Sequence, residues 1–93
     1  MAIKFHYHTA LRELPRLGIE RGDPLCHVYS DTSVEELLGW GEARGIPRRA
    51  LQLNHALPHF DLFGKHLELC GEGVERRELV RDIRKWRGRR DPS

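Results

Sequence analysis

The fold is decided by Leu25-Cys26-His27-Val28-Tyr29-Ser30-Asp31, a run of branched, aromatic and small residues that predicts a buried strand. A shorter run of the same kind, His59-Phe60-Asp61-Leu62, follows further along the chain. Side chains alternate across a strand, so His27 shares a face with Asp31, and His59 shares a face with Asp61. Two such strands side by side would gather imidazoles and carboxylates on one surface, which is typical of a polar site rather than of a hydrophobic core.

Helix signals separate these strands. Ser33-x-x-Glu36 is a capping-box pattern that predicts a helix beginning near Ser33, and Gly45-Ile46-Pro47 predicts its end. We expect further elements at residues 3–8 (strand), 63–70 (short helix), 74–75 (brief strand) and 77–86 (final helix with an apolar stripe). Strands that alternate with helices predict an α/β fold: a small three- to four-stranded, largely parallel sheet flanked by helices. Ligands of such folds bind beyond the carboxyl ends of the strands, where we expect His8, Asp31 and Asp61.

Length and composition limit the classes of protein to which this chain can belong. Ninety-three residues suffice for one domain, which we place at residues 1–87, with residues 88–93 as a flexible C-terminal tail. The 39% hydrophobic and 32% charged residues are typical of a globular protein. No apolar run approaches the roughly 18 residues that span a bilayer, and the N-terminus lacks a secretory signal pattern, so we expect a cytoplasmic protein with no membrane partner. Two cysteines are too few for a disulfide framework.

Charge is distributed unevenly along the chain. Residues 76–90 hold eight lysines and arginines against two acids, whereas the rest of the chain holds eight against twelve. A basic helix of this kind predicts a second class of function, a nucleic-acid-binding or protein-interaction module that uses Arg77, Arg81, Arg84 and Lys85. The alternative is a solvated helix surface that serves solubility.

Several short motifs also occur in a characteristic order: Cys26-His27-x4-Thr32 with Asp31, Glu35-Glu36-Leu37, Gly45-Ile46, His59-Phe60-Asp61-Leu62 and Arg77-Glu78-Leu79-Val80. Over about residues 25–80 the chain therefore resembles an uncharacterised bacterial family, domain of unknown function 4031. The resemblance implies an α/β fold and a shared polar surface, and it supplies no activity. The chain departs from the family where paired aspartates tend to end the first strand (here His6-Tyr7-His8), at a helix histidine (here Leu38), and at a Lys-Arg pair (here Lys65-His66).

The histidines and aspartates admit three uses. In an acid–base or hydrolytic site, the catalytic residues would be His27, Asp31, His59 and Asp61. In a metal site, His27, His59 and Asp61 would be ligands, with His6 and His8 as additional donors. In an anion or small-ligand site, the contacts would come from His8, Lys65 and His66.

Purely structural roles compete with these uses. Asp31 could cap the following helix, His27 could be a hydrogen-bonded core histidine, and His59 and Asp61 could bond to each other. No CxxC, HExxH, phosphate-loop or nucleophile-elbow pattern selects a reaction, so the sequence leaves open whether the protein is an enzyme. We expect a small ligand, an anion or a divalent metal to bind a His/Asp pocket at the strand ends. The exposed edge of a small sheet also predicts a homodimer.

Overall fold

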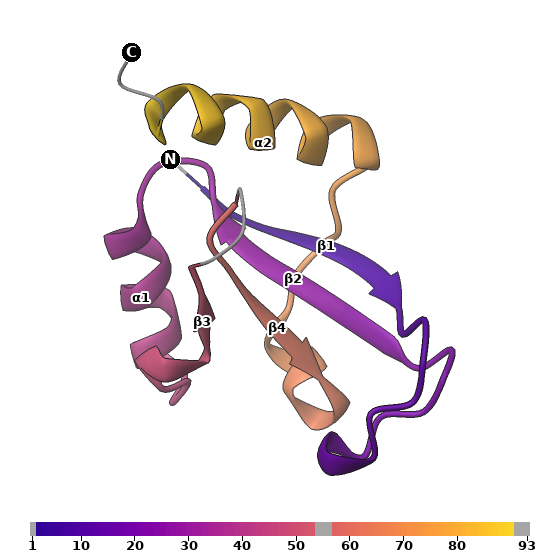
Figure 1. Ribbon diagram of the computed structural model, residues 1–93. Helices are drawn as coiled ribbons and strands as arrows, with labels where there is room; N and C mark the ends of the chain where they lie inside the picture. Colours follow the sequence, from indigo (N-terminus) through magenta and orange to yellow (C-terminus); the bar gives the residue numbers. More distant parts are fainter. Residues whose placement is uncertain (1, 54–56, 91–93) are drawn as a thin grey trace.

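The computed structural model describes residues 2–53 and 57–90, which form one four-stranded sheet with two α-helices (Figure 1). The strands are β1 (Ile3–Thr9), β2 (Pro24–Ser30), β3 (Leu51–Gln52) and β4 (His59–Phe63). The helices are α1 (Val34–Ala43) and α2 (Arg76–Arg90), with three short 3₁₀ helices, η1 (Pro15–Leu17), η2 (Arg48–Ala50) and η3 (Gly64–Leu69). The strand order is β1-β2-β4-β3, and every neighbouring pair is antiparallel.

The prediction of a largely parallel sheet was therefore wrong. Two connections explain the difference. Residues 10–23 return β1 directly to its neighbour β2 without a crossover helix, as antiparallel strands permit. Between α1 and β4, the two-residue strand β3 reverses the chain once more, so that β4 runs against β2 instead of along it.

Three smaller expectations also change. The strand expected at residues 74–75 is a single parallel bridge between Phe5 and Gly73. The helix expected at residues 63–70 is the 3₁₀ helix η3. The final helix extends to Arg90, so it includes residues 88–90, and residues 91–93 lie outside the described chain.

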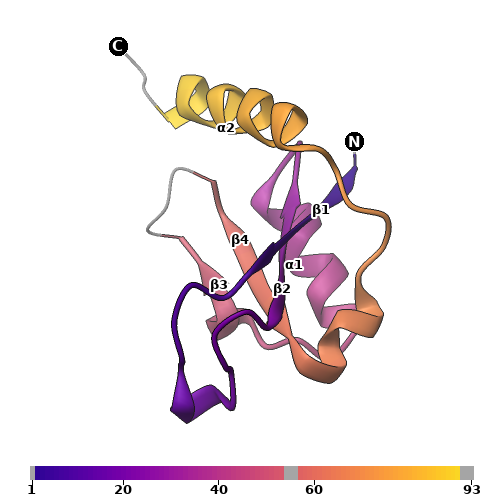
Figure 2. The same cartoon turned by 90° about the vertical axis from the view of Figure 1, so that its right-hand side faces the viewer.

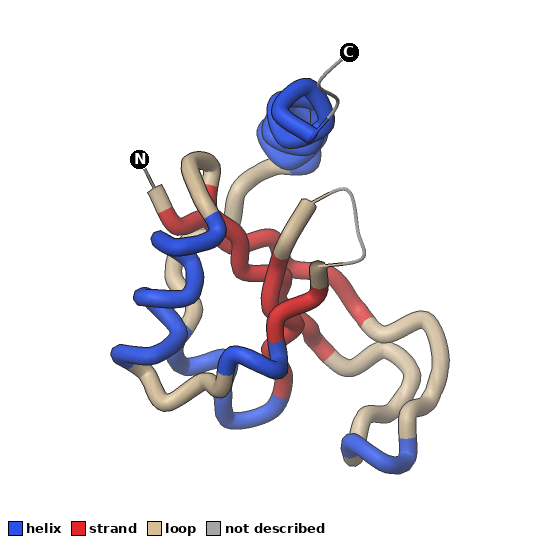
Figure 3. Tube along the Cα trace, turned by 60° about the vertical axis from the view of Figure 1, so that its left-hand side comes forward, coloured by secondary structure: helices blue, strands red, loops and turns tan. Residues whose placement is uncertain are grey.

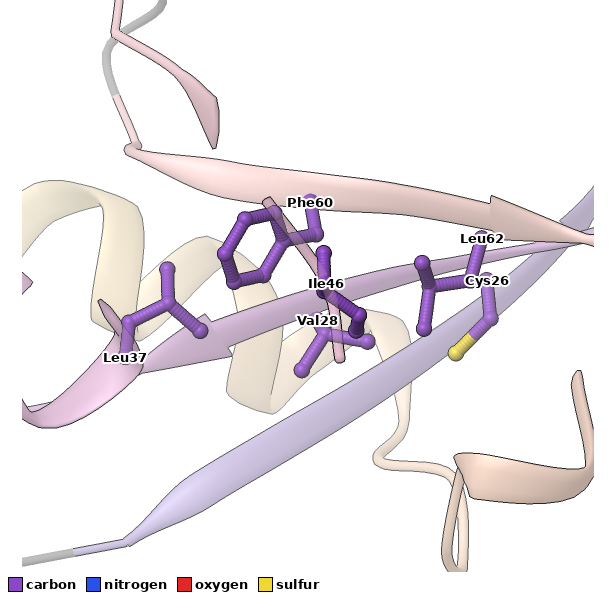
Figure 4. Packing of buried hydrophobic residues seen from close by; sticks show 6 residues of the cluster. All are labelled: Cys26, Val28, Leu37, Ile46, Phe60 and Leu62. Atoms are coloured by element: carbon purple, nitrogen blue, oxygen red, sulfur yellow. The ribbon is translucent and has the colours of Figure 1, made fainter. Parts of the chain in front are cut away.

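One face of the sheet packs on α1. Cys26 and Val28 of β2 and Phe60 and Leu62 of β4 form the core there, together with Leu37 and Ile46 (Figure 4). Within α1, Gly41 makes this close packing possible, because a Cβ at that position would lie 2.9 Å from the Phe60 ring. The core therefore fixes every second residue of β2 and β4 and turns the residues between them to the opposite face.

The opposite face is covered at one end by α2. Figures 2 and 3 show α1 on one side of the sheet and α2 crossing the end where β1 begins and β2 finishes. Under α2 lies a second, smaller cluster of Tyr29, Leu57 and Trp86, and the Trp86 indole N–H donates a 2.9 Å hydrogen bond to the Ser30 carbonyl. The remainder of this face is left for polar side chains.

A buried carboxylate secures α2 to the sheet. Asp82 is fully buried, and its Oδ2 accepts hydrogen bonds from the Tyr29 hydroxyl at 2.7 Å and from Lys4 Nζ at 2.9 Å. Burial and the contact with Asp82 raise the pKa of Tyr29. Burial opposes the charge of Lys4, but its bonds to Asp82 and Glu78 outweigh that effect and raise its pKa. The network therefore contains a protonated tyrosine and lysine around one buried acid.

We expect Asp82→Ala to lower the free energy of unfolding by about 3–5 kcal/mol, because it removes two hydrogen bonds to a charged group, from Tyr29 and from Lys4, each worth about 1.5–3 kcal/mol. Tyr29→Phe should cost about 1.5–3 kcal/mol, the usual contribution of a hydrogen bond to a charged group. Urea denaturation followed by tryptophan fluorescence measures both. The control is Glu75→Ala, an exposed acid just before α2, which should stay within about 0.5 kcal/mol of wild type. An Asp82→Ala variant as stable as the control would contradict this role.

Candidate metal centre

Strand register gathers the histidines of three strands on the face opposite the α1 core. His6 of β1 lies opposite His27 of β2, and His27 lies opposite Asp61 of β4. Directly paired residues point to the same face, and so do residues two apart on one strand, which adds His8 and His59. We call these five residues the His/Asp cluster. The alternation expected within β2 and β4 is thus present, and β1 extends the row.

Asp61 is the centre of the cluster. Its Oδ1 lies 3.0 Å from His27 Nε2 and 3.5 Å from His59 Nε2. The other ring nitrogen of His59, Nδ1, is 2.7 Å from the Leu57 carbonyl oxygen. A carbonyl only accepts hydrogen bonds, so this contact places a proton on Nδ1 and leaves Nε2 facing Asp61. In the neutral ring Nε2 carries a lone pair, which would face the negatively charged carboxylate of Asp61. A proton or a cation between the two atoms is needed to make this contact favourable.

The electrostatics of this pair follow from the contacts. Burial would raise the pKa of Asp61, but hydrogen bonds with His27 and His59 outweigh it and hold that pKa well below its ordinary value. Burial likewise opposes protonation of His59, yet the contacts with Asp61 and the Leu57 carbonyl outweigh it and raise the pKa of that ring. Asp61 is therefore an anion throughout the neutral range, able to balance a proton or a metal ion.

His8 completes a set of three metal donors. Its ring centroid is 4.1 Å from that of His27, and its Nε2 is buried without a hydrogen-bond partner among the described residues. One donor atom each from His8, His27 and Asp61 lies within 4.8 Å of the other two. Tetrahedral zinc with bonds of about 2.1 Å would place its ligands about 3.4 Å apart, so a modest closure of these side chains would suffice.

His6 lies at the margin of the cluster. Its ring centroid is 6.2 Å from that of His27, and its Nδ1 is buried with no hydrogen-bond partner in the described chain. Burial and the neighbouring His27 lower the pKa of both His6 and His8, and Arg76 adds to the effect on His6. Both rings are thus favoured in the neutral form, which is the form that binds metal.

Asp31 does not join the cluster. It lies just beyond the end of β2, the opposite end of the sheet from His8, because antiparallel strands do not share their carboxyl ends. Its carboxylate accepts hydrogen bonds from the Ala2 amide and the Thr32 hydroxyl, both at 2.8 Å, and is 3.6 Å from Lys4 Nζ. The expected capping of α1 comes from Ser33, whose hydroxyl accepts from the Glu36 amide at 3.1 Å.

Lys65 and His66 also lie outside the His/Asp cluster, although His66 and Asp61 both line a small surface hollow beside Pro47. Lys65 and His66 are exposed residues of η3, and they line another surface hollow with Asp23, Pro24 and Phe63. The residue that sequence reasoning missed is Asp82, the buried acid on the side of α2 that faces the sheet. Its signal was present, because Asp82 occupies the same spacing as the apolar residues Leu79, Ile83 and Trp86. An acid within an apolar stripe indicates a buried ion pair.

Comparison with known families adds one finding. A family model described as "Protein of unknown function (DUF4031)" matches residues 15–86. The chain belongs to this family. The DUF4031 match confirms the resemblance expected from the sequence motifs, and it includes His27, His59 and Asp61, whereas His6 and His8 of β1 precede it. No curated protein and no solved structure matches the chain. Among the described residues of this DUF4031 chain, no helix is both long and apolar enough to cross a membrane.

We expect the pKa of His59 to lie above the ordinary histidine value near 6.5, and the pKa values of His6 and His8 to lie below it. A raised pKa means that the His59–Asp61 contact stabilises the fold below the ordinary value and is lost as the pH rises through the higher folded value. Side-chain ¹H–¹⁵N NMR in the presence of a chelator measures each ring. Asp61→Asn should lower the pKa of His59, since burial is then opposed only by the contact with the Leu57 carbonyl. A His59 pKa unchanged by this substitution would refute the assignment.

Proposed function

We propose that the protein binds a divalent transition-metal ion of the zinc class through His8, His27 and Asp61. The main support is that three strands each contribute one donor atom, and these three atoms lie within 4.8 Å of one another. The unpartnered, buried Nε2 of His8 supports the proposal, because a buried polar atom without a partner is costly unless a ligand satisfies it.

The donor set favours particular ions. Two imidazole nitrogens and one carboxylate oxygen suit zinc, nickel, cobalt or ferrous iron, whereas magnesium and calcium prefer sites made of oxygen. Three protein ligands on a partly exposed sheet face leave room for a fourth, such as water or an anionic small ligand, which is the arrangement of catalytic rather than structural zinc. A metal so held would lower the pKa of a bound water, and this is the chemistry a hydrolytic role would use.

His59 has a different part in this proposal. Its Nε2 lies 3.5 Å from Asp61, and its Nδ1 is anchored by the Leu57 carbonyl. Partners of this kind orient a ligating carboxylate and tune its basicity, and their removal weakens metal binding by about 10–100-fold. His59 could also replace His8 as the second nitrogen ligand. The two roles of His59, ligand or orienting partner, are distinguished by how much metal affinity is lost when it is substituted.

The scaffold supports a preformed site. Residues 27, 59 and 61 alternate with Val28, Phe60 and Leu62, which are buried in the core against α1. The side-chain directions of His27, His59 and Asp61 are therefore fixed by packing on the other face of the same strands, as a metal site requires.

Zinc added to chelator-treated protein should bind at one site in isothermal titration calorimetry, and magnesium should not. We expect His27→Gln, His8→Gln and Asp61→Asn to weaken zinc binding by more than about 100-fold, and His59→Gln by about 10–100-fold. The matched control is His66→Gln, an exposed histidine of η3, which should bind as wild type does. Zinc at 100 times its dissociation constant should also stabilise wild type by about 2.7 kcal/mol in thermal melts.

Two results would overturn the proposal. One is zinc affinity in His27→Gln and Asp61→Asn equal to that of the His66→Gln control. The other is a greater loss in His66→Gln than in the cluster variants, which would place the binding site at η3. A loss larger in His59→Gln than in His8→Gln would exchange the roles given to these two histidines.

A further inference from the structure

The two acids of α2 both point inward. Glu78 and Asp82 lie one helical turn apart and both contact the same partner, Lys4 Nζ, at 2.9 Å. Residues four apart share one side of a helix, so the negative charge of α2 is confined to the side that faces the sheet. Both acids pair with Lys4, and in the described chain no ion pair joins either of them to an arginine of the same helix.

The outer side of α2 is correspondingly basic. Five of its exposed cations surround the exposed side chain of Val80: Arg76, Arg77, Arg81, Arg84 and Lys85. In the described chain no ion pair joins any of these five cations to an acid. We call this surface the basic face.

The arrangement is unfavourable for an isolated helix. Arg77, Arg81 and Lys85 follow one another at spacings of four, and like charges at this spacing repel by a few tenths of a kcal/mol per pair. Packing of Trp86 and the bonds of Asp82 hold the helix in spite of the repulsion. Solubility alone would be served as well by mixed charges, so an unbalanced basic face indicates a polyanionic partner.

We propose that the basic face of α2 binds the phosphate backbone of duplex nucleic acid. Residues 76–87 extend about 16 Å along the helix axis, roughly the length of five base-pair steps. Arginine guanidinium groups bind phosphate oxygens in a bidentate manner and are the majority of these cations. The only aromatic residue of α2, Trp86, is buried, so the face offers phosphate contacts and no base stacking. Binding is accordingly independent of sequence and prefers duplexes to single strands.

A membrane surface fits the same face less well. A helix that lies in a bilayer interface inserts an apolar side, and the apolar side of α2 is already packed on the sheet through Leu79, Ile83 and Trp86. Val80 is the one apolar side chain at the centre of the basic face. This proposal does not depend on the metal centre.

Fluorescence anisotropy with a labelled 20-base-pair duplex tests the proposal, using full-length protein. If four or more cations contact phosphates, affinity should fall about 100-fold or more between 50 and 200 mM salt, a log–log slope near −3.6 or steeper. A labelled single strand of equal length should bind more weakly.

Matched triple variants locate the surface. Arg77→Gln/Arg81→Gln/Arg84→Gln should bind at least tenfold more weakly at 50 mM salt, with the slope reduced by about 2.7 for three lost contacts. Arg12→Gln/Arg16→Gln/Arg21→Gln removes the same charge from exposed positions between β1 and β2 and should bind as wild type does. Glutamine has nearly the helix propensity of arginine, and circular dichroism confirms that both variants fold.

Four outcomes would overturn the proposal. They are no binding at 50 mM salt, equal losses in the two triple variants, tighter binding to anionic phospholipid vesicles or to polyglutamate than to the duplex, and loss of duplex binding in Asp61→Asn. The last result would place the anion at the metal centre instead of α2, whereas duplex binding that is retained in Asp61→Asn keeps the anion on α2.

Discussion

The position of α2 depends on one buried carboxylate. Asp82 would be very costly to bury alone, since a charge withdrawn from water loses several kcal/mol of solvation. Lys4 and Tyr29 offset part of that cost through Oδ2, and both come from the sheet, so these bonds favour the arrangement with α2 across the end of β1 and β2. The other oxygen, Oδ1, is buried with no hydrogen-bond partner among the described residues. The apolar cluster under α2 is small: among the described residues its buried members are Tyr29, Leu57 and Trp86. Polar bonds therefore specify where this helix lies, and packing supports them.

The same strands form the core and the candidate site. Val28, Phe60 and Leu62 point towards α1, and His27, His59 and Asp61 point the other way. A register slip of one residue would move the imidazoles into the core and the apolar residues into water, so the hydrophobic pattern also enforces the geometry of the cluster. This explains how a chain of 93 residues can hold a site without a separate domain for it.

Parts of this fold could be predicted from the sequence because their signals are local. The strands at β2 and β4, the capping box at Ser33 and the end of α1 each depend on a few adjacent residues. Strand direction is not local: it depends on β3, where two residues pair with β4 and carry no periodicity to detect. His8 was expected near the site because it ends a strand. In the structure His8 is near the site for a different reason: it shares a sheet face with His27. That proximity depends on the register between β1 and β2. An acid within an apolar stripe marks Asp82 locally, but its partner Lys4 is 78 residues away in the chain and could not be predicted.

The His/Asp cluster and the basic face also influence each other through charge. Burial and His27 lower the pKa of His6, and Arg76 at the start of α2 adds to the effect, so this arginine opposes positive charge on that imidazole. The same field opposes a cation in the cluster, and Asp61 is the single carboxylate there to offset it. Phosphates along α2 would cancel part of the arginine field and thereby favour a metal ion bound at the cluster. Coupling of this kind is reciprocal, so an ion in the cluster would equally favour a polyanion on α2. Screening limits the effect to about 8–10 Å in physiological salt, so it reaches the cluster chiefly from the first turn of the helix.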